Sequence, residues 1–508
     1  MNLNQKEYLI MKRLLAMLLA LLMLASLVAG CGAKNEDGAE TTTTATATVA
    51  GGDDMSVSDT PPAETDPPEE TRELAIEKYD RDFVIYQAGN WGYKDFVAED
   101  MTGEPVNDAV YNMLSSVSEE FGVKFTTVDH GGKASGGQGQ GYKTVETMHM
   151  SGSQDYDLTS IGCYDVCTLA YTGYLTDLAA IDNVSLEKSW YDQKAYDMLN
   201  LNGHLYYITG DAMTLDNNCT YCILFNKTVV DQYKLDDPYQ LVKDNKWTYD
   251  KFIEMGSVLP ADLNGDGIRN RNDAYGVTVW LDSIVGMLHA SGGAIAQIND
   301  EGKFELTLNT ERNIDVLTNW TRAGASELSN FITSDTDETA HKSFTTNNCL
   351  FYTRYIGIGS YFRDSDLDFG FLPYPKWDEE QENYCNTMHA YGTSWLCIPS
   401  SVKDIEQSGA IMESLSYYGQ KLVNPAYYEI TLEGKTIRDE ESADMLDIIF
   451  ATRFFDVGFY YQVGDYNNTI FDMFYGGNTN FSSLFKASEK IVAKQLEKID
   501  DSFEKIAG

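Results

Sequence analysis

The sequence predicts an α/β protein with two or three domains. From residue 82 onward, short apolar strands alternate with segments whose apolar residues repeat at helical spacing. This alternation predicts a mostly parallel sheet with helices on its faces. The chain has 508 residues, of which 43% are hydrophobic and 12% are aromatic, so it can bury more than one core. An apolar segment near the N-terminus, with the pattern of an export signal, indicates that the folded part works outside the cytoplasm.

The first elements follow a strand–helix–strand order twice. They are strands at 83–86, 123–128 and 157–161, and helices over 106–121, 142–150 and 165–178. In parallel sheets, ligands bind beyond the carboxyl ends of the strands. The loops at Asn90–Trp91 and 162–165 are therefore candidate contact points, although Trp91 is equally compatible with the core.

The first 31 residues resemble the signal of a bacterial lipoprotein. Lys12 and Arg13 precede an apolar run from Leu14 to Val28, which ends in small residues and Cys31. This run is shorter than the roughly 20 residues that span a bilayer, so we expect a cleaved signal rather than a transmembrane helix. The resemblance implies that Cys31 is lipidated and holds the protein at the extracellular face of the cell membrane. The alternative is an ordinary secretory signal with a chance cysteine.

Residues 32–78 have a different composition from the rest of the chain. They are acidic and rich in Thr and Pro, with too little apolar surface to offset the entropy of ordering, so we expect a disordered stalk. The whole chain carries 78 acidic and 37 basic residues, a formal net charge of -41. Such a charge argues against nucleic acid or anionic lipid headgroups as partners.

Cysteine and glycine patterns exclude several kinds of site. The cysteines after Cys31 are odd in number and widely spread, which is not the pattern of a disulfide scaffold. Cys219 and Cys222 have the spacing of half a zinc or redox site, but no second pair lies nearby, so buried free thiols are expected. The glycine cluster at 131–141 matches no phosphate-binding loop, and we expect a mobile surface loop there.

A series of short landmarks runs through the middle of the chain. They are LFNK at 224–227, WTYDKF at 247–252, DLNGDG at 262–267, DAYG at 273–276, FLPYP at 371–375 and IPS at 398–400. In this order and spacing they resemble extracellular solute-binding proteins, family 1, over residues 80–508. The resemblance implies a two-lobe, periplasmic-binding-protein-like (type II) fold with a ligand cleft between the lobes. It also implies delivery of the ligand, commonly a sugar or oligosaccharide, to the permease subunits of an ABC transporter.

The resemblance further implies how the chain divides between the lobes. Lobe 1 is expected to contain 80–217 and 390–455, and lobe 2 to contain 218–389 and 456–508. The chain would then cross between lobes near 218–225, near 388–394 and around 455. Hinge closure over a solute needs no bond to be broken, so we expect a binding protein rather than an enzyme, and a monomer.

Candidate ligand-binding residues come from their positions near strand ends, because the family shares no binding motif. Sugar hydroxyls pair with carboxylates, amides and guanidinium groups, and sugar C–H faces pack on aromatic rings. The candidates are Asn90, Trp91, Asp165, Asp211, Trp280, Asp282, Arg354, Tyr355 and Trp395. Each of them is also compatible with core packing or with a solvated surface.

The segment 262–273 has the pattern of an EF-hand-type calcium loop. Oxygen-bearing side chains stand at positions 1, 3, 5 and 12, and Gly267 at position 6 allows the sharp turn. The expected ligands of a structural Ca²⁺ are Asp262, Asn264, Asp266, Ile268 (through its carbonyl) and Asp273. Asp273 is shorter than the usual glutamate, and a bare Asn-Gly turn is the alternative.

Two other function classes share the export signal and the aromatic richness. An extracytoplasmic glycoside hydrolase or other surface enzyme is the main alternative, since two carboxylates suffice for glycoside hydrolysis. The sequence has no HExxH pair and no GxSxG elbow. A surface glycan-binding adhesin or sensor differs from an importer component only in its partner.

Overall fold

The computed structural model describes residues 70–507 except 75, 134–135, 333–340, 363–364 and 434–439. The expected signal peptide, Cys31 and the stalk up to residue 69 lie outside the described residues. The chain divides into two units, 1–68 and 69–508, and the fold below is that of the second. Nowhere in the described part is a helix both long and apolar enough to cross a membrane.

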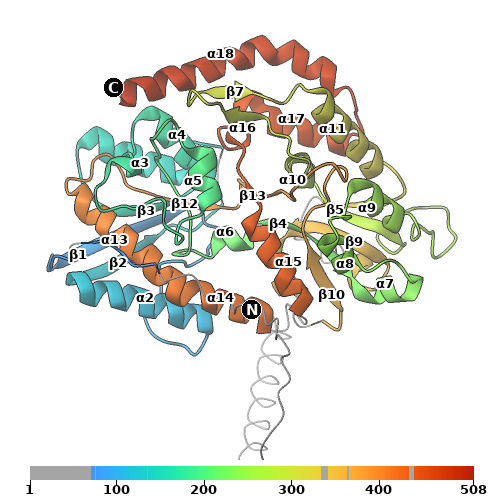
Figure 1. Ribbon diagram of the computed structural model, residues 1–508, viewed down its shortest axis with the longest axis horizontal. Coiled ribbons are helices and arrows are strands. Elements are labelled where there is room, and N and C mark those ends of the chain that lie inside the picture. The colour runs from blue at the N-terminus through green and yellow to red at the C-terminus, as the bar shows by residue number, and fades with distance from the viewer. Residues whose placement is uncertain are drawn as a thin grey trace, which may run out of the picture. The chain divides into compact units, whose positions relative to one another are not determined.

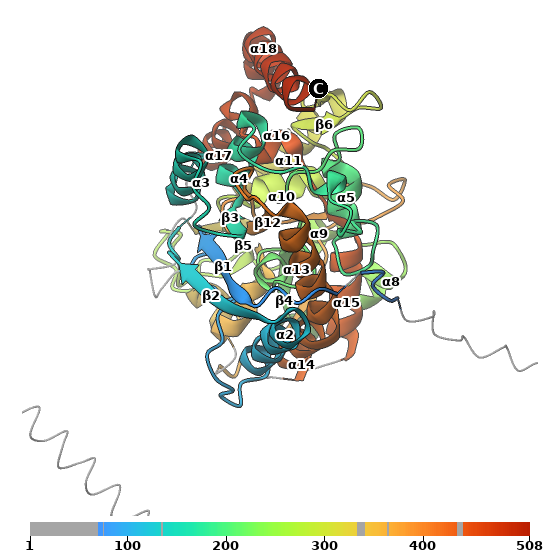
Figure 2. The ribbon, with the colours of Figure 1, turned by 90° about the vertical axis from the view of Figure 1, so that its left-hand side faces the viewer.

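The first sheet has four strands in the order β12-β3-β1-β2. β1 (Arg81–Ala88) pairs in parallel with β2 (Val123–Asp129) and β3 (Leu158–Gly162), and β12 (Ser394–Cys397) pairs antiparallel with β3. Two helix pairs lie on opposite faces (Figures 1 and 2). They are α2 (Pro105–Phe121) with α13 (Ile405–Tyr418), and α3 (Gln140–Ser151) with α4 (Cys163–Thr172). The strand and helix order expected for residues 82–178 is confirmed.

Local chemistry explains why α2 begins and ends where it does. The Glu104 side chain accepts a hydrogen bond from the Asn107 amide, and Pro105 occupies the first turn, where no amide donor is needed. Gly122 ends the helix in the left-handed region, with φ 65°. The buried residues of α2 follow helical spacing and pack on the sheet: Ala109, Val110, Met113, Leu114, Val117 and Phe121.

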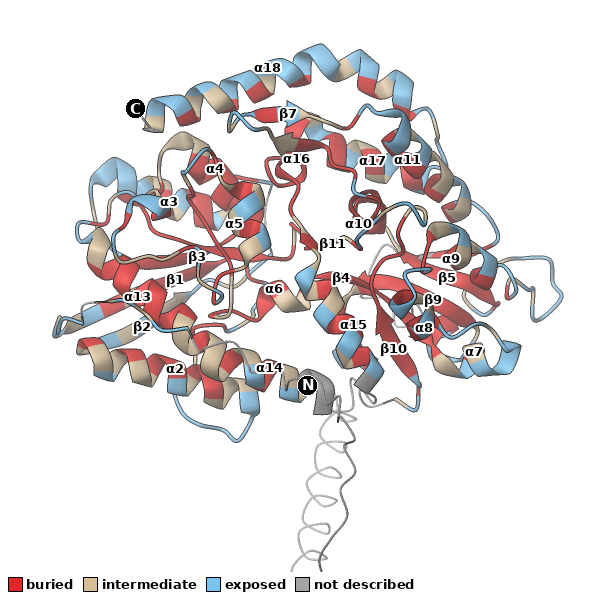
Figure 3. Cartoon of the chain, in the orientation of Figure 1, coloured by how far each residue is buried: buried red, intermediate tan, exposed pale blue. Residues whose placement is uncertain are grey.

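The second sheet has five strands in the order β10-β4-β9-β5-β8. β5 (Tyr275–Trp280) is parallel to β8 (Ser329–Ile332) and β9 (Cys349–Tyr355). β4 (Tyr221–Asn226) is antiparallel to β9 and to β10 (Phe369–Leu372). The surrounding helices are α7 (Lys227–Tyr233), α8 (Pro238–Lys243), α9 (Tyr249–Gly256), α10 (Ser283–Ala290), α11 (Glu311–Gly324) and α12 (Lys342–Thr345). Apart from the edge strand β2, the strands with described burial are largely buried, so each sheet is the centre of a lobe (Figure 3).

Several short elements lie between the two sheets or beside them. α6 (Leu215–Asn218) and β13 (Arg453–Phe454) lie between the sheets in Figure 1. β13 pairs in parallel with β11 (Asn386–Thr387). The remaining elements of this part are α5 (Gln193–Leu199), the β6–β7 hairpin (Ala296–Ile298 and Phe304–Leu306), the 3₁₀ helices η1 (Leu178–Ala180) and η2 (Ile356–Phe362), the π-helical turn η3 (Gly419–Val423), α14 (Asn424–Glu433) and α15 (Glu440–Ala451).

The C-terminal segment covers one side of both lobes. It contains α16 (Val457–Tyr460), η4 (Val463–Asp465), α17 (Tyr466–Tyr475) and α18 (Phe481–Ala507). α18 packs on α4 of the first lobe and on β7 and α11 of the second (Figure 1). The Phe503 ring lies 5.4 Å from Tyr206 and 6.2 Å from Phe304, centre to centre, so it joins aromatic side chains of both lobes.

Three parts of the expected lobe division differ from the structure. α15, expected in lobe 1, packs on β10 of the second sheet, where the Tyr239 hydroxyl lies 2.6 Å from the Ser442 hydroxyl. α18, expected in lobe 2, contacts both lobes. The end of the expected stalk, from residue 70, lies on the first lobe, where Arg72 donates to Glu120 at 2.9 Å and lies over the Tyr417 ring. Contacts between segments distant in sequence determine where these segments pack, and the local sequence pattern does not predict such contacts.

Candidate functional site

The loop after β1 presents Trp91 to solvent. Trp91 adopts a left-handed backbone (φ 55°) and is 39% exposed. Its amide donates to the Gly132 carbonyl at 2.8 Å, and its indole Nε1–H donates to the Tyr391 carbonyl at 2.9 Å. Asn90, which is fully buried, donates to Asp129 at 3.1 Å and accepts from the Gly92 amide. Asn90 therefore braces the loop, while Trp91 is its exposed contact residue.

The second lobe contributes four of the predicted residues from two neighbouring strand ends. Trp280 and Asp282 follow β5, and Arg354 and Tyr355 end β9. The guanidinium carbon of Arg354 lies 3.5 Å from the centre of the Trp280 ring and 4.4 Å from that of Tyr355. Arg354 Nη2 donates to the Tyr355 hydroxyl at 3.0 Å. A guanidinium that is 1% exposed is thus held between two aromatic faces.

The segment 388–393 joins the side chains of the two lobes. His389 Nε2 donates to Asp282 Oδ2 at 2.8 Å, and the His389 ring stacks on Tyr355 with centres 5.9 Å apart. The Tyr391 ring lies 5.5 Å from Trp91 and 6.2 Å from Tyr164, centre to centre. These contacts bring residues of both lobes and of this crossing segment into one group, which we call the interlobe cluster: Trp91, Tyr164, Trp280, Asp282, Arg354, Tyr355, His389 and Tyr391.

A separate cavity of about 360 Å³ is lined by Tyr93, two residues after Trp91, and by Ile356, which follows Tyr355, but by no member of the interlobe cluster. Its walls come from the loop after β1, the start of α2, α6, η2 and α14, so residues of both lobes line it. Its polar lining residues are Tyr93, Lys94, Glu104, Asn107, Thr214, Asn218, Ser360 and Tyr427. Burial, followed by the nearby Cys219 and Tyr355, raises the pKa of Tyr93, which keeps its hydroxyl neutral as a hydrogen-bonding group. The cluster supplies aromatic faces, and the cavity supplies further hydrogen-bonding groups from segments adjacent in sequence to cluster residues.

Three predicted site residues have structural contacts outside the cluster. Asp165 is buried and accepts hydrogen bonds from the Gly139 and Tyr142 amides at the start of α3, at 2.8 and 3.2 Å. Trp395 is fully buried, with its ring 5.3 Å from that of Tyr207. A helix start and the core occupy these side chains and place them outside the interlobe cluster, so their contact with a ligand stays a prediction. Asn90 likewise braces the loop instead of facing the cavity.

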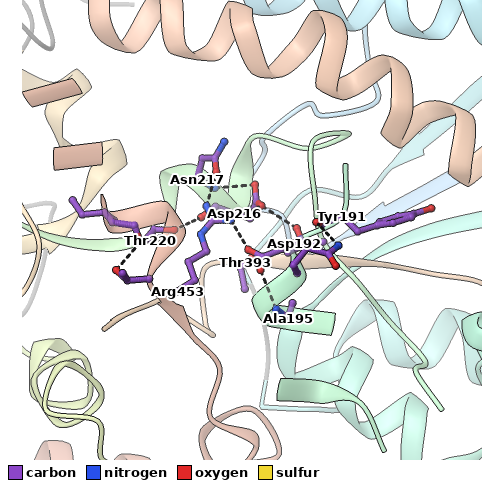
Figure 4. A network of polar contacts seen from close by, with 12 residues as sticks. Tyr191, Asp192, Ala195, Asp216, Asn217, Thr220, Thr393 and Arg453 are labelled. Carbon is purple, nitrogen blue, oxygen red and sulfur yellow. Dashed lines mark hydrogen bonds and ion pairs between the residues drawn. The ribbon is translucent and has the colours of Figure 1, made fainter. Parts of the chain in front are cut away.

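Asp211 lies in a second cavity, of about 340 Å³, near β13. Asp192, Asp216 and Arg453 also line this cavity. Arg453 donates to Asp192 at 2.9 Å and to Asp216 at 3.3 Å, as Figure 4 shows. Burial, reinforced by the charge of Asp216, raises the pKa of Asp211 to about 7. The structure thus places Asp211 apart from the cluster, in an acidic network beside a crossing segment.

The raised pKa of Asp211 predicts a pH-dependent stability. Between its unfolded pKa near 4 and its folded pKa of about 7, the folded state binds the extra proton, so this residue's contribution to stability falls as pH rises through that range. Asp211→Asn should therefore raise the melting temperature at pH 8 by a few degrees and change it little at pH 5. Thermal unfolding at the two pH values measures this. A lower melting temperature of the variant at pH 8 contradicts it.

The predicted calcium loop has the expected turn, but its carboxylates are engaged with backbone amides. Gly265 and Gly267 adopt φ 70° and 76°, and Asp262 accepts from both of their amides at 2.8 and 2.7 Å. Asp266 accepts from the Ile268 amide, and Asp273 from the Leu263 and Asn270 amides. Among the described residues, no three carboxylate, imidazole or thiol groups converge as metal ligands. The turn fits a calcium loop, whereas the carboxylates are not gathered around one point.

Calcium binding at this loop stays a prediction with a direct test. Calorimetric titration of the wild type with Ca²⁺ should give a saturable heat, because hard oxygen ligands stand at the required spacing. Asp266→Ala should abolish that heat, whereas Asp250→Ala, on the nearby helix α9, should retain it. A wild type without calcium-dependent heat contradicts the prediction.

The other two sequence motifs have structural contacts among the described residues. Cys219 and Cys222 are buried free thiols, as expected. The Gly131 and Gly132 carbonyls accept hydrogen bonds from the Gly89 and Trp91 amides, at 2.9 and 2.8 Å. The start of the glycine cluster therefore supports the loop that carries Trp91.

Sequence reasoning missed Tyr164, His389 and Tyr391. Tyr164 is one residue from the predicted Asp165, at the same strand end. His389 and Tyr391 lie in the segment 388–394, where the chain was expected to cross between the lobes. That expected crossing could have identified both residues as candidates. Five predicted residues are in the cluster: Trp91, Trp280, Asp282, Arg354 and Tyr355.

Comparisons with known proteins bear on the fold. No protein-family model and no curated protein matches the sequence. Solved structures match across nearly their whole length. The ABC substrate-binding protein Lmo0181 from Listeria monocytogenes, in complex with cycloalternan, is 14% identical with a TM-score of 0.53, covering 82% of this chain and 100% of its own.

Two further solved structures give the same result. A cyclo/maltodextrin-binding protein complexed with maltotetraose is 12% identical with a TM-score of 0.53, covering 85% of this chain and 99% of its own. MalX from Streptococcus pneumoniae, in complex with maltopentaose, is 15% identical with a TM-score of 0.51, covering 81% of this chain and 100% of its own. The chain therefore has the two-lobe, type II fold of the substrate-binding proteins of ABC transporters.

Proposed function

We propose that this protein captures an oligosaccharide between its lobes and delivers it intact to an ABC importer, while a lipid on Cys31 holds it at the extracellular face of the membrane. The interlobe cluster carries the proposal. It places exposed and partly exposed rings beside a carboxylate, an imidazole and a guanidinium, drawn from both lobes and a crossing segment. Sugars need both kinds of surface, rings for their C–H faces and polar groups for their hydroxyls.

The position of the cluster supports a binding mechanism based on lobe closure. Trp91 belongs to one lobe, Trp280 and Arg354 to the other, and His389 to the segment between them. A ligand that contacts both lobes favours the closed arrangement by its differential affinity for it. The solved structures with this fold carry cycloalternan, maltotetraose and maltopentaose, which supports oligosaccharides as the ligand class.

The carboxylates of the site favour binding over hydrolysis. Glycosidases use two carboxylates on either side of the scissile bond, one of them as an acid. In the described part of the cluster and cavity, Asp282 accepts from His389, and Glu104 accepts from the Asn107 amide at the start of α2. Both carboxylates therefore have a structural hydrogen bond, which supports binding as the function.

A saccharide panel tests the proposed function. Maltooligosaccharides and other neutral and acidic oligosaccharides are added to the purified protein, and the melting temperature is measured. A ligand at one hundred times its Kd stabilises the folded state by about 2.7 kcal/mol, which is readily detected. Chromatography of the same mixtures should recover the saccharide intact. No shift with any saccharide, or the appearance of shorter products, contradicts the proposal.

A further inference from the structure

Three segments of the chain connect the two sheets, and they meet at one buried charge network. The first contains α6 and leads from β3 to β4, and the second contains β11 and leads from β10 to β12. The third leads from α13, which packs on α2, through α14 and α15 to β13. β13 pairs with β11, and Arg453 on β13 donates to Asp216 on α6 at 3.3 Å (Figure 4). β13 and its Arg453 therefore link the three connecting segments, which together we call the junction.

The network at the junction has more carboxylates than cations. Asp192 and Asp216 both accept from Arg453, whereas Asp211, in the same cavity of about 340 Å³, forms no ion pair among the residues that the structure describes. Lys194 is the other basic residue that lines this cavity, and it is exposed. Three carboxylates thus share one buried guanidinium, and Asp211 is the one that this cation does not bind.

η3 and several titratable groups complete the surroundings of Asp211. η3 packs on the Asp211 backbone, because a Cβ on Gly419 would collide with the Asp211 carbonyl oxygen. Burial and the charge of Asp216 raise the pKa of Asp211 to about 7, although the Gln420 side chain on η3 and Arg453 oppose the shift. The other titratable groups on the elements around Asp211 are Glu70, Tyr191, Lys421, Tyr428 and Asp447. Asp211 therefore changes its charge near neutral pH, directly beside the junction.

We propose that protonation of Asp211 determines how tightly the junction is held, so that its ionisation loosens the connections between the lobes. The ionised carboxylate is repelled by Asp192 and Asp216, and it needs hydration that the packed junction does not provide. Separation of β13 and η3 from the first lobe exposes Asp211 to water and relieves both penalties. The freedom of the lobes to move then depends on pH, whichever ligand the protein binds.

The direction of the pH dependence follows from the two states of Asp211. In a loosened junction the carboxyl is solvated and has an ordinary pKa of about 4, whereas in the packed junction its pKa is about 7. The packed junction therefore binds the proton more tightly, and it is weakened as pH rises from about 4 to about 7. Between pH 6 and pH 8 the equilibrium constant for loosening should rise roughly ten-fold.

Hydrogen exchange of the ligand-free protein tests the inference. Exchange is followed by mass spectrometry at pH 6 and pH 8 and is divided by the intrinsic rate at each pH. In the wild type, the corrected rate should rise roughly ten-fold in all three connecting segments, at 211–218, 386–389 and 450–456, and stay constant in α2. In Asp211→Asn, which does not ionise, the corrected rate of these segments should not change with pH. Asp197→Asn, at an exposed position of α5, is the matched control and should behave like the wild type.

Three outcomes overturn the inference. A corrected rate that does not change with pH in the wild type, or that changes equally in Asp211→Asn, removes Asp211 as the controlling group. A rise confined to 211–218 shows that ionisation loosens only the cavity wall and leaves the junction intact. The wild-type measurement needs no variant, so poor folding of Asp211→Asn leaves the test decisive. No saccharide is present, so the result is independent of the proposed function.

Discussion

Replacing Trp91 by alanine is expected to weaken saccharide binding by roughly thirty-fold, more than any other single substitution in the cluster. Trp91 is the large, exposed ring of the site, and burying an aromatic contact of this size contributes about 2 kcal/mol to binding. The loop should keep its conformation, because Asn90 and Gly132 hold its backbone. The loss of the bond to the Tyr391 carbonyl costs about 1 kcal/mol of stability, so the melting temperature should fall only by a few degrees.

Two further variants separate stacking from other causes. Trp91→Phe keeps a ring but loses the indole N–H, and it should retain most of the affinity if the face of the ring is what matters. Tyr233→Ala removes a ring that is 43% exposed on α7, away from the cluster, and it should bind like the wild type. Calorimetric Kd values for the saccharide found in the panel measure all three. Unchanged affinity of Trp91→Ala would remove the ring from the binding site.

The rule that ligands bind beyond the carboxyl ends of parallel strands predicted five members of the interlobe cluster. It did not predict the surroundings of Asp165 and Trp395, for specific reasons. It identifies the end of a sheet at which ligands bind, and Trp91, Trp280 and Arg354 lie there. It does not specify where a side chain at that end points. Asp165 turns toward the amides at the start of α3, and Trp395 points into the core between strand and helices. Both environments are created by segments distant in sequence, so the sequence around each residue carries no sign of them.

The same distinction applies to the fold. The first β-α units were predictable because each turn of apolar residues and each helix-ending glycine is a local signal, as at α2 and Gly122. The second sheet depends on the pairing of β4 with β9 and with β10, both of which lie far from β4 along the chain. The placement of α15 on β10 was not predicted for the same reason. The pattern of an amphipathic helix indicates that one of its faces is buried, but it does not indicate which surface that face covers.

The second prediction with a large effect concerns Arg453, whose side chain is 6% exposed beside Asp192 and Asp216. The Asp192 carboxylate also accepts from the Ala195 amide at the start of α5, and the Asp216 carboxylate accepts from the Thr209 hydroxyl and the Asn217 amide (Figure 4). Arg453 thereby connects β13 to the first lobe and to α6. Arg453→Met keeps much of the volume and leaves two buried carboxylates without their counter-ion, which should cost about 3–5 kcal/mol of folding free energy.

Denaturant unfolding of the wild type and variants at pH 8 measures this loss. Lys243→Met is the matched control, because Lys243 pairs with Asp444 on the surface, where a lost ion pair costs about 1 kcal/mol or less.

Burial already raises the pKa of Asp216, and Arg453 opposes that shift. Without Arg453 the carboxylate takes up a proton more readily, so the loss should be smaller at pH 5 than at pH 8. Adding Asp216→Asn to Arg453→Met should restore part of the stability, because it removes one of the two unpaired charges. A loss no greater than that of Lys243→Met would mean that water reaches these carboxylates, and that the link between β13 and the first lobe does not depend on the buried charge.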